Sequence, residues 1–82
     1  MATLYAAHEI VGWIQQYIAN LLQLETQDVD TDVEFASYGL TSSSAVALIA
    51  DLEDALGCEL SPALLFEYPT IDALAKHLAS QV

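Results

Sequence analysis

The chain has 82 residues, 55% of them hydrophobic, and its twelve acidic residues and one lysine give a formal net charge of −11. This length allows one domain with one core, residues 1–82, and the single cysteine excludes a disulfide within the chain. The charge excludes nucleic acid as a partner, because phosphate contacts need Lys and Arg.

The first predicted helix covers residues 5–22. Apolar side chains recur there at helical spacing, and the predicted core stripe consists of Leu4, Ile10, Val11, Ile14, Ile18, Leu21 and Leu22. Trp13 and Tyr17 are four residues apart and should lie together on a flank of the helix, partly in the core. Gly12 weakens this helix, since glycine costs ~1 kcal/mol relative to alanine in a helix interior.

A long loop is expected from Gln23 to Thr41, where no hydrophobic period is sustained. The side chains predicted to anchor it to the core are Val29, Val33 and Phe35. The stretch Asp28–Asp32 imitates the opening of a calcium-binding loop, but Val33 stands where such a loop needs a glycine, and Gly39 where it needs a bidentate glutamate. We therefore predict a solvated acidic loop and no metal site.

The second predicted helix spans residues 42–56, and Gly57 is placed to end it. Its predicted core stripe consists of Ala45, Leu48, Ile49, Leu52 and Leu56. Cys58 follows this helix and has no histidine near it in the sequence, so we interpret it as a half-buried packing residue rather than a nucleophile.

Two shorter helices complete the predicted fold. Ser61 and Pro62 are suited to cap and begin a third helix over residues 62–66, which Pro69 would stop. Thr70 can cap a fourth helix, whose inward side chains would be Ile71, Leu74, Ala75 and Leu78. The chain is therefore predicted to be all-α: a four-helix bundle with a long loop between the first and second helices and a short third helix.

A serine cluster, Ser42–Ser44, opens the second predicted helix directly after the turn at Gly39. A serine run in this place is commonly only a helix cap. The dipole and the unpaired N–H groups of a helix N-terminus would, however, also stabilise a phosphate attached there.

The residues around this cluster resemble acyl carrier proteins, and more specifically the carrier domains of polyketide synthases, in which Gly-x-Asp-Ser precedes the second helix. The matching segments are Phe35…Gly39-Leu40-x-Ser42, Ala45-Val46-x-Leu48, Leu52-Glu53, Leu60-Ser61-Pro62, Tyr68-Pro69-Thr70-Ile71, Leu74-Ala75 and His77-Leu78. Two positions depart from the family pattern. Thr41 replaces an aspartate that would meet a basic group of the modifying enzyme, and Ser43 replaces a hydrophobic residue.

The resemblance implies an acyl carrier protein (an acyl carrier domain over residues 1–82) for polyketide, fatty-acid or other lipid-like biosynthesis. Ser42 would receive 4′-phosphopantetheine from coenzyme A through a phosphopantetheinyl transferase, and the thiol of this arm would hold acyl groups as thioesters. An acyl-adenylate ligase or an acyltransferase would load the arm, and a ketosynthase or other synthase domain would use it.

The carrier itself would not be an enzyme, because no base is evidently placed to activate the serine: His8 and His77 fall in other predicted helices. Two alternatives stay open from the sequence. The modified residue could be Ser43 or Ser44, although the register of Ala45-Val46 favours Ser42, and the chain could be an unmodified helical interaction module with this fold.

Partner enzymes are expected to recognise the start and the exposed face of the second helix. The residues nominated for this face are Thr41, Ser43, Val46, Ala47, Ala50, Asp51 and Asp54. Ala47 stands where the family often has glutamate, so we expect docking through shape and apolar contact, with acids elsewhere steering the approach. The alternative is that Val46 and Ala50 pack against the long loop.

The sequence carries no sign of export or of a membrane span. No Lys or Arg precedes Lys76, so the basic start of a secretory signal is missing, and the longest strictly apolar run, residues 45–50, is too short to cross a bilayer. We therefore expect a cytoplasmic monomer. Its charge either steers it toward basic partners or simply keeps a hydrophobic small domain in solution, and composition alone favours the second explanation.

Overall fold

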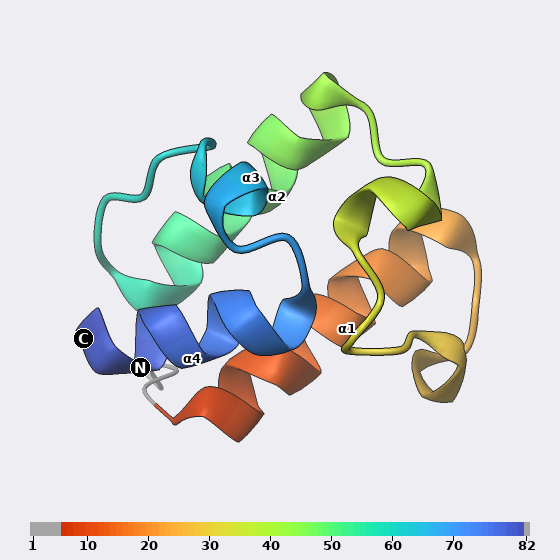
Figure 1. Cartoon of the computed structure of the whole chain (residues 1–82), viewed down its shortest axis with the longest axis horizontal. Helices are drawn as coiled ribbons and strands as arrows, with labels where there is room; N and C mark the ends of the chain where they lie inside the picture. The colour runs from red at the N-terminus through yellow and green to blue at the C-terminus, as the bar shows by residue number, and fades with distance from the viewer. Residues whose placement is uncertain (1–5, 82) are drawn as a thin grey trace.

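The computed structural model describes residues 6–81, with side chains as far as Ser80. In chain order its elements are α1 (Ala7–Leu22), the 3₁₀ turns η1 (Thr26–Asp28) and η2 (Phe35–Tyr38), α2 (Ser42–Leu56), α3 (Leu64–Glu67) and α4 (Ile71–Gln81). Figure 1 shows α1 and α4 side by side, with the long loop at the opposite end of the molecule from the last turn of α4. Within residues 6–81 the only strand-like pairing is one antiparallel bridge between Glu34 and Thr70. The predicted all-α four-helix fold is confirmed.

All four helices and the loop contribute buried side chains to one core. Its members are Ile10, Ile14, Ile18, Ala19, Val29, Phe35, Leu48, Ile49, Leu52, Leu56, Leu65, Ile71, Leu74, Ala75 and Leu78. The inward residues predicted for α4 are all among them, as are those predicted for α2 except Ala45, which is half-buried. Helical spacing therefore predicted correctly which faces of these two helices are buried.

The last turns of α1 bury Ile18 and part of Leu22, as predicted, but differ from the prediction at two positions. Leu21 is 44% exposed, whereas Ala19 is buried. The loop covers α1 at this end, and the side-chain amide of Gln15 donates a hydrogen bond of 2.9 Å to the carbonyl of Val29. Ala19 lies one turn after Gln15, so it shares the face that the loop covers. The prediction of Leu21 as a core residue was wrong because the burying partner changes along the helix.

The boundaries of α1 and α2 lie close to their predicted positions. α2 has the predicted bounds, and Gly57 ends it with a left-handed φ of 72°. α1 begins at Ala7, after Ala6, whose N–H donates a hydrogen bond to the Glu9 carboxylate at 3.4 Å. The first residue of the predicted helix, position 5, lies outside the described residues, as does Leu4 of the predicted stripe.

α3 begins at Leu64, two residues after its predicted start, and ends at Glu67 rather than at residue 66. Ser61 is not its cap, since the residue before α3 is Ala63, which makes no side-chain capping bond. The hydroxyl oxygen of Ser61 instead accepts a hydrogen bond from the N–H of Ala63 at 3.2 Å, in the turn before the helix. The carbonyl of Ser61 accepts one from the N–H of Leu64 at 3.0 Å, a bond between residues three apart. The segment therefore forms a tight turn before it forms an α-helix.

The long loop is held against α4 by paired hydrogen bonds. The hydroxyl of Thr31 donates to the Asp72 carboxylate at 2.9 Å, and the N–H of Asp72 donates to the Thr31 carbonyl at 3.0 Å. The N–H of Phe35 donates to the Pro69 carbonyl at 2.8 Å. As predicted, Phe35 is buried in the core, as is Val29, while Val33 is half-buried. These bonds fix the approach of the chain to α2.

Among the described residues, no group of three or more His, Cys, Asp or Glu side chains could hold a metal ion. Among the helices described, none has the length and apolar character needed to cross a membrane.

Candidate functional site: a groove at the start of α2

The turn before α2 sets the position of Ser42. Gly39 ends η2 in the left-handed conformation, with φ 75°, which is accessible to glycine at little steric cost. Thr41 then caps α2, and its side-chain oxygen accepts a hydrogen bond from the N–H of Ser44 at 3.2 Å. Ser42, the first residue of α2, is exposed. Local geometry thus presents the Ser42 side chain at the helix N-terminus.

The three serines of the cluster differ in their surroundings. The Ser44 side chain is half-buried, and its hydroxyl oxygen accepts a hydrogen bond from the Thr41 hydroxyl at 3.3 Å. Ser43 is exposed but does not line the groove described next, whereas Ser42 does. These differences separate Ser42 from its two neighbours.

An open groove of about 240 Å³ lies beside Ser42, between the start of α2, η2 and the segment around α3. Its walls are formed by Glu34, Phe35, Ala36, Leu40, Thr41, Ser42, Ala45, Leu65, Phe66 and Pro69. Most of these side chains are apolar. The groove therefore offers a largely apolar surface next to one exposed hydroxyl.

Phe66 is an exposed groove residue that the sequence did not single out as part of a site. Its side chain is 77% exposed, while its neighbour Leu65 is buried. The run Leu64-Leu65-Phe66 carried the signal, because three consecutive apolar residues on a single helical turn cannot all face one core.

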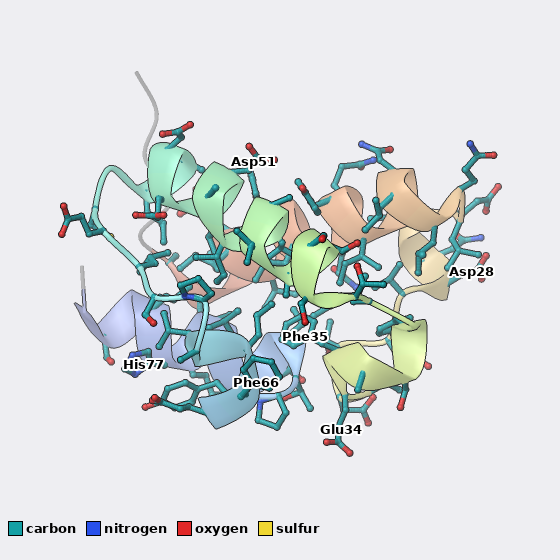
Figure 2. All side chains as sticks on the ribbon, turned by 90° about the horizontal axis from the view of Figure 1, so that it is seen from above. Asp28, Glu34, Phe35, Asp51, Phe66 and His77 are labelled. Atoms are coloured by element: carbon teal, nitrogen blue, oxygen red, sulfur yellow. The ribbon has the colours of Figure 1, made fainter. Side chains whose placement is uncertain are left out.

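The electrostatics of the site favour a phosphate on Ser42. It stands at the N-terminus of a fifteen-residue helix whose first turn contains no acidic residue. Unpaired N–H groups and the positive end of the dipole lie there. Among the residues lining the groove, Glu34 is the only one with an ionisable side chain, and Figure 2 shows it projecting away from the body of the molecule.

No residue lining the groove is a histidine. His8 is exposed on α1, and His77 lines a separate pocket of about 310 Å³ together with Cys58. The His77 ring stacks on Tyr68 with 4.1 Å between ring centroids. Cys58 is half-buried, as predicted. The groove therefore presents a hydroxyl without an imidazole beside it to take its proton.

The face nominated for partner recognition is exposed at each of its seven positions: Thr41, Ser43, Val46, Ala47, Ala50, Asp51 and Asp54. Val46 is 51% exposed, so the alternative in which Val46 and Ala50 pack against the loop was wrong. In the view of Figure 2, Asp51 lies in the upper part of the molecule, and Phe66 and Glu34 lie in its lower part.

Asp51 is coupled to α1 through Tyr17. Partial burial raises the pKa of the Tyr17 hydroxyl, and the hydrogen bond to Asp51 and its negative charge raise it further. The Tyr17 ring stacks on Trp13 with 5.4 Å between centroids, so these two residues share the flank predicted for them.

A family described as "Phosphopantetheine attachment site" matches residues 12–78 of this chain. The acyl carrier protein TtuC of Teredinibacter turnerae is 31% identical over 92% of this chain and 86% of its own length. A phenolphthiocerol/phthiocerol polyketide synthase of Mycobacterium tuberculosis is 37% identical over 100% of this chain. The chain spans only 4% of the length of that synthase.

Solved structures with the same fold include two carriers of similar size. A free-standing peptidyl carrier protein from Acinetobacter baumannii superposes with a TM-score of 0.88 and 38% identity, covering 95% of this chain and 98% of its own. An acyl carrier protein from Anabaena sp. PCC 7120, Asl1650, superposes with a TM-score of 0.91 and 38% identity, covering 98% and 91%. It is described as having a variant phosphopantetheinylation-site sequence.

Proposed function

Because the chain belongs to the phosphopantetheine-attachment family of carrier proteins, we propose that its arm is attached to Ser42. The observation that carries this proposal is the difference among the three serines: Ser42 alone is both exposed and part of the groove at the start of α2. The family match also favours a modified carrier over an unmodified interaction module.

The residues around Ser42 fit a phosphodiester. The first turn of α2 supplies N–H groups and a positive dipole end and holds no carboxylate that would repel the phosphate. Thr41 keeps this turn in place through its bond to the N–H of Ser44. The attached group supplies the thiol that holds acyl groups as thioesters, while the protein supplies position and recognition.

Because the groove holds no histidine and its one carboxylate projects outward, the base that deprotonates Ser42 would come from the transferase. The carrier is then not an enzyme. Its proposed partners are a phosphopantetheinyl transferase, a loading enzyme (an acyl-adenylate ligase or an acyltransferase) and a ketosynthase or other synthase domain. They would meet it in the cytoplasm and recognise the nominated face of α2, with residues 1–82 acting as one carrier domain.

The experiment is a measurement of intact mass after incubation with coenzyme A and a broad-specificity phosphopantetheinyl transferase. The parent is compared with Ser42→Ala, Ser43→Ala and Ser44→Ala. We expect one phosphopantetheine on the parent, Ser43→Ala and Ser44→Ala, and none on Ser42→Ala. A gain on Ser42→Ala that is lost in one of the other two variants would move the site to that serine.

A further inference from the structure

Phe66 is an aromatic side chain held in solvent on a protein with a net charge of −11. Its 77% exposure is the largest among the exposed large hydrophobic residues of the described chain. A solitary exposed apolar residue needs no explanation, but one that lines a groove beside a reactive hydroxyl is a candidate contact for a partner.

The exposure of Phe66 is fixed by its surroundings. The preceding residue, Leu65, is buried in the core and anchors the short α3. The N–H of Phe66 donates to the Ala63 carbonyl at 3.0 Å, and the N–H of Tyr68 donates to the Leu64 carbonyl at 2.8 Å. The backbone of α3 is therefore fixed with the Phe66 ring outside, and a partner that binds the ring does not have to order the helix first.

Two exposed apolar side chains lie near Ser42. Phe66 stands on the wall of the groove that Ser42 also lines, and Val46, 51% exposed, stands one turn further along α2. The acids of α2 are distant from this position, although the exposed Glu34 lines the groove and the exposed Glu67 follows Phe66 in the chain. Asp51 is nine residues beyond Ser42, which corresponds to ~14 Å along a helix, more than a Debye length at moderate salt.

An enzyme that modifies Ser42 must bring the phosphate of coenzyme A into bonding contact with the Ser42 oxygen. Its surface must then come close to the groove that Ser42 lines, and Phe66 stands on the wall of this groove. Resting on the proposed attachment at Ser42, we infer that the phosphopantetheinyl transferase docks on Phe66 and Val46. It takes the Phe66 ring into an apolar pocket, and recognition rests on apolar burial rather than on an ion pair with α2. Aromatic anchors of this kind commonly dominate an interface.

The test is the rate of phosphopantetheine transfer, followed by mass spectrometry at a series of carrier concentrations with coenzyme A and a broad-specificity transferase. For Phe66→Ala we expect KM to rise at least about tenfold, with kcat close to that of the parent. Phe66→Leu should recover most of the loss. Leu21→Ala is the matched control, since Leu21 is 44% exposed on α1 and does not line the groove.

Circular dichroism checks that the variants are folded, and the same kinetics are measured at low and moderate salt. We expect the ratio of KM between Phe66→Ala and the parent to be the same at both salt concentrations, because the burial of an apolar side chain is not screened. A parent that is not modified at all would contradict the proposed function itself.

With a modified parent, three results would overturn the inference. The first is a KM for Phe66→Ala within twofold of the parent. The second is a KM ratio between Phe66→Ala and the parent that falls toward one as the salt concentration rises, which would indicate that the effect of the substitution is electrostatic. The third is normal transfer onto Phe66→Ala with slowed acyl exchange with a synthase domain, which would assign Phe66 to a different partner.

Discussion

Thr41 precedes Ser42 at the position where carrier proteins of this family have an aspartate. Its side-chain oxygen accepts the N–H of Ser44 at 3.2 Å, so it caps α2 as an aspartate would. It brings no charge to the edge of the groove. Thr41 therefore retains the helix-capping hydrogen bond that an aspartate would make, but it does not supply the negative charge of an aspartate.

Removing this cap should destabilise the domain. We expect Thr41→Ala to lower the free energy of unfolding by about 1 kcal/mol, because the N–H of Ser44 loses its partner. Thr41→Asp should retain the stability of the parent, since its carboxylate can accept the same bond and lies favourably at a helix N-terminus. Urea denaturation measures both. Equal stability of Thr41→Ala and the parent would contradict a capping role.

The raised pKa of Tyr17 predicts an effect of pH on stability. Burial, then the Asp51 hydrogen bond and charge, raise the pKa of Tyr17 above its ordinary value of 10.0 in the folded state. Since the neutral hydroxyl is favoured on folding, this contribution to stability is complete below pH 10 and is lost as the pH rises through the raised pKa.

Replacing Asp51 should lower this pKa. We expect Asp51→Asn to move the pKa of Tyr17 down toward its ordinary value without reaching it, because the burial remains. An NMR titration of the Tyr17 ring measures the shift. Asp54→Asn is the control, since Asp54 contributes nothing to the Tyr17 shift. An unchanged pKa of Tyr17 in Asp51→Asn would contradict an electrostatic effect of Asp51 on Tyr17.

At the scale of helices, two glycines have opposite expected effects. Gly57 ends α2 with φ 72°, a conformation that costs an L side chain roughly 1 kcal/mol. Gly12 lies inside α1, and a Cβ added there meets nothing within 4 Å. We expect Gly57→Ala to destabilise the domain by about 1 kcal/mol and Gly12→Ala to stabilise it by about the same amount.

Thermal melts of Gly57→Ala, Gly12→Ala and the parent measure these two changes in stability. A change of about 1 kcal/mol corresponds to roughly 4–8 °C in a domain of this size. The two shifts should have opposite signs. A loss of stability in Gly12→Ala would mean that the exposed side of α1 is more crowded than the structure indicates.

The bounds of α2 could be predicted from nearby residues, whereas those of α3 could not. α2 has its predicted bounds because both signals that define them, the cap at Thr41 and the glycine at Gly57, act within four residues. α3 differs because Ser61 and Pro62 can form either a tight turn or a first helical turn. The structure has the tight turn, and Leu65 is buried in the core in this arrangement.

Charge acts on the whole molecule. Of the twelve acids, all but Glu53 and Asp72 have exposed side chains, and Lys76 is the only basic residue beside the two histidines. Mutual repulsion among these carboxylates opposes the compact state. At ~10 mM salt the screening length is about 30 Å, longer than the described domain, and at 0.1 M it is about 10 Å.

We therefore expect the melting temperature to rise between ~10 mM and ~0.1 M KCl. If screening of this repulsion stabilises the folded state by about 1 kcal/mol, the melting temperature should rise by roughly 4–8 °C. A triple variant, Asp28→Asn, Asp30→Asn and Asp32→Asn, carries three fewer charges in the loop and should show a smaller rise. A melting temperature that stays flat in the parent would show that repulsion does not limit stability.

The sequence by itself determined the number and order of the helices, the bounds of α2 and the inward faces of α2 and α4, because these depend on neighbours within about four residues and on a regular period. It also singled out Ser42, whose attachment of the arm stays a prediction. Only the tertiary structure decided that Ala19 is buried in place of Leu21, and that Phe66 stands outside the core next to Ser42. Those outcomes depend on which distant segments pack together, a property that local spacing does not encode.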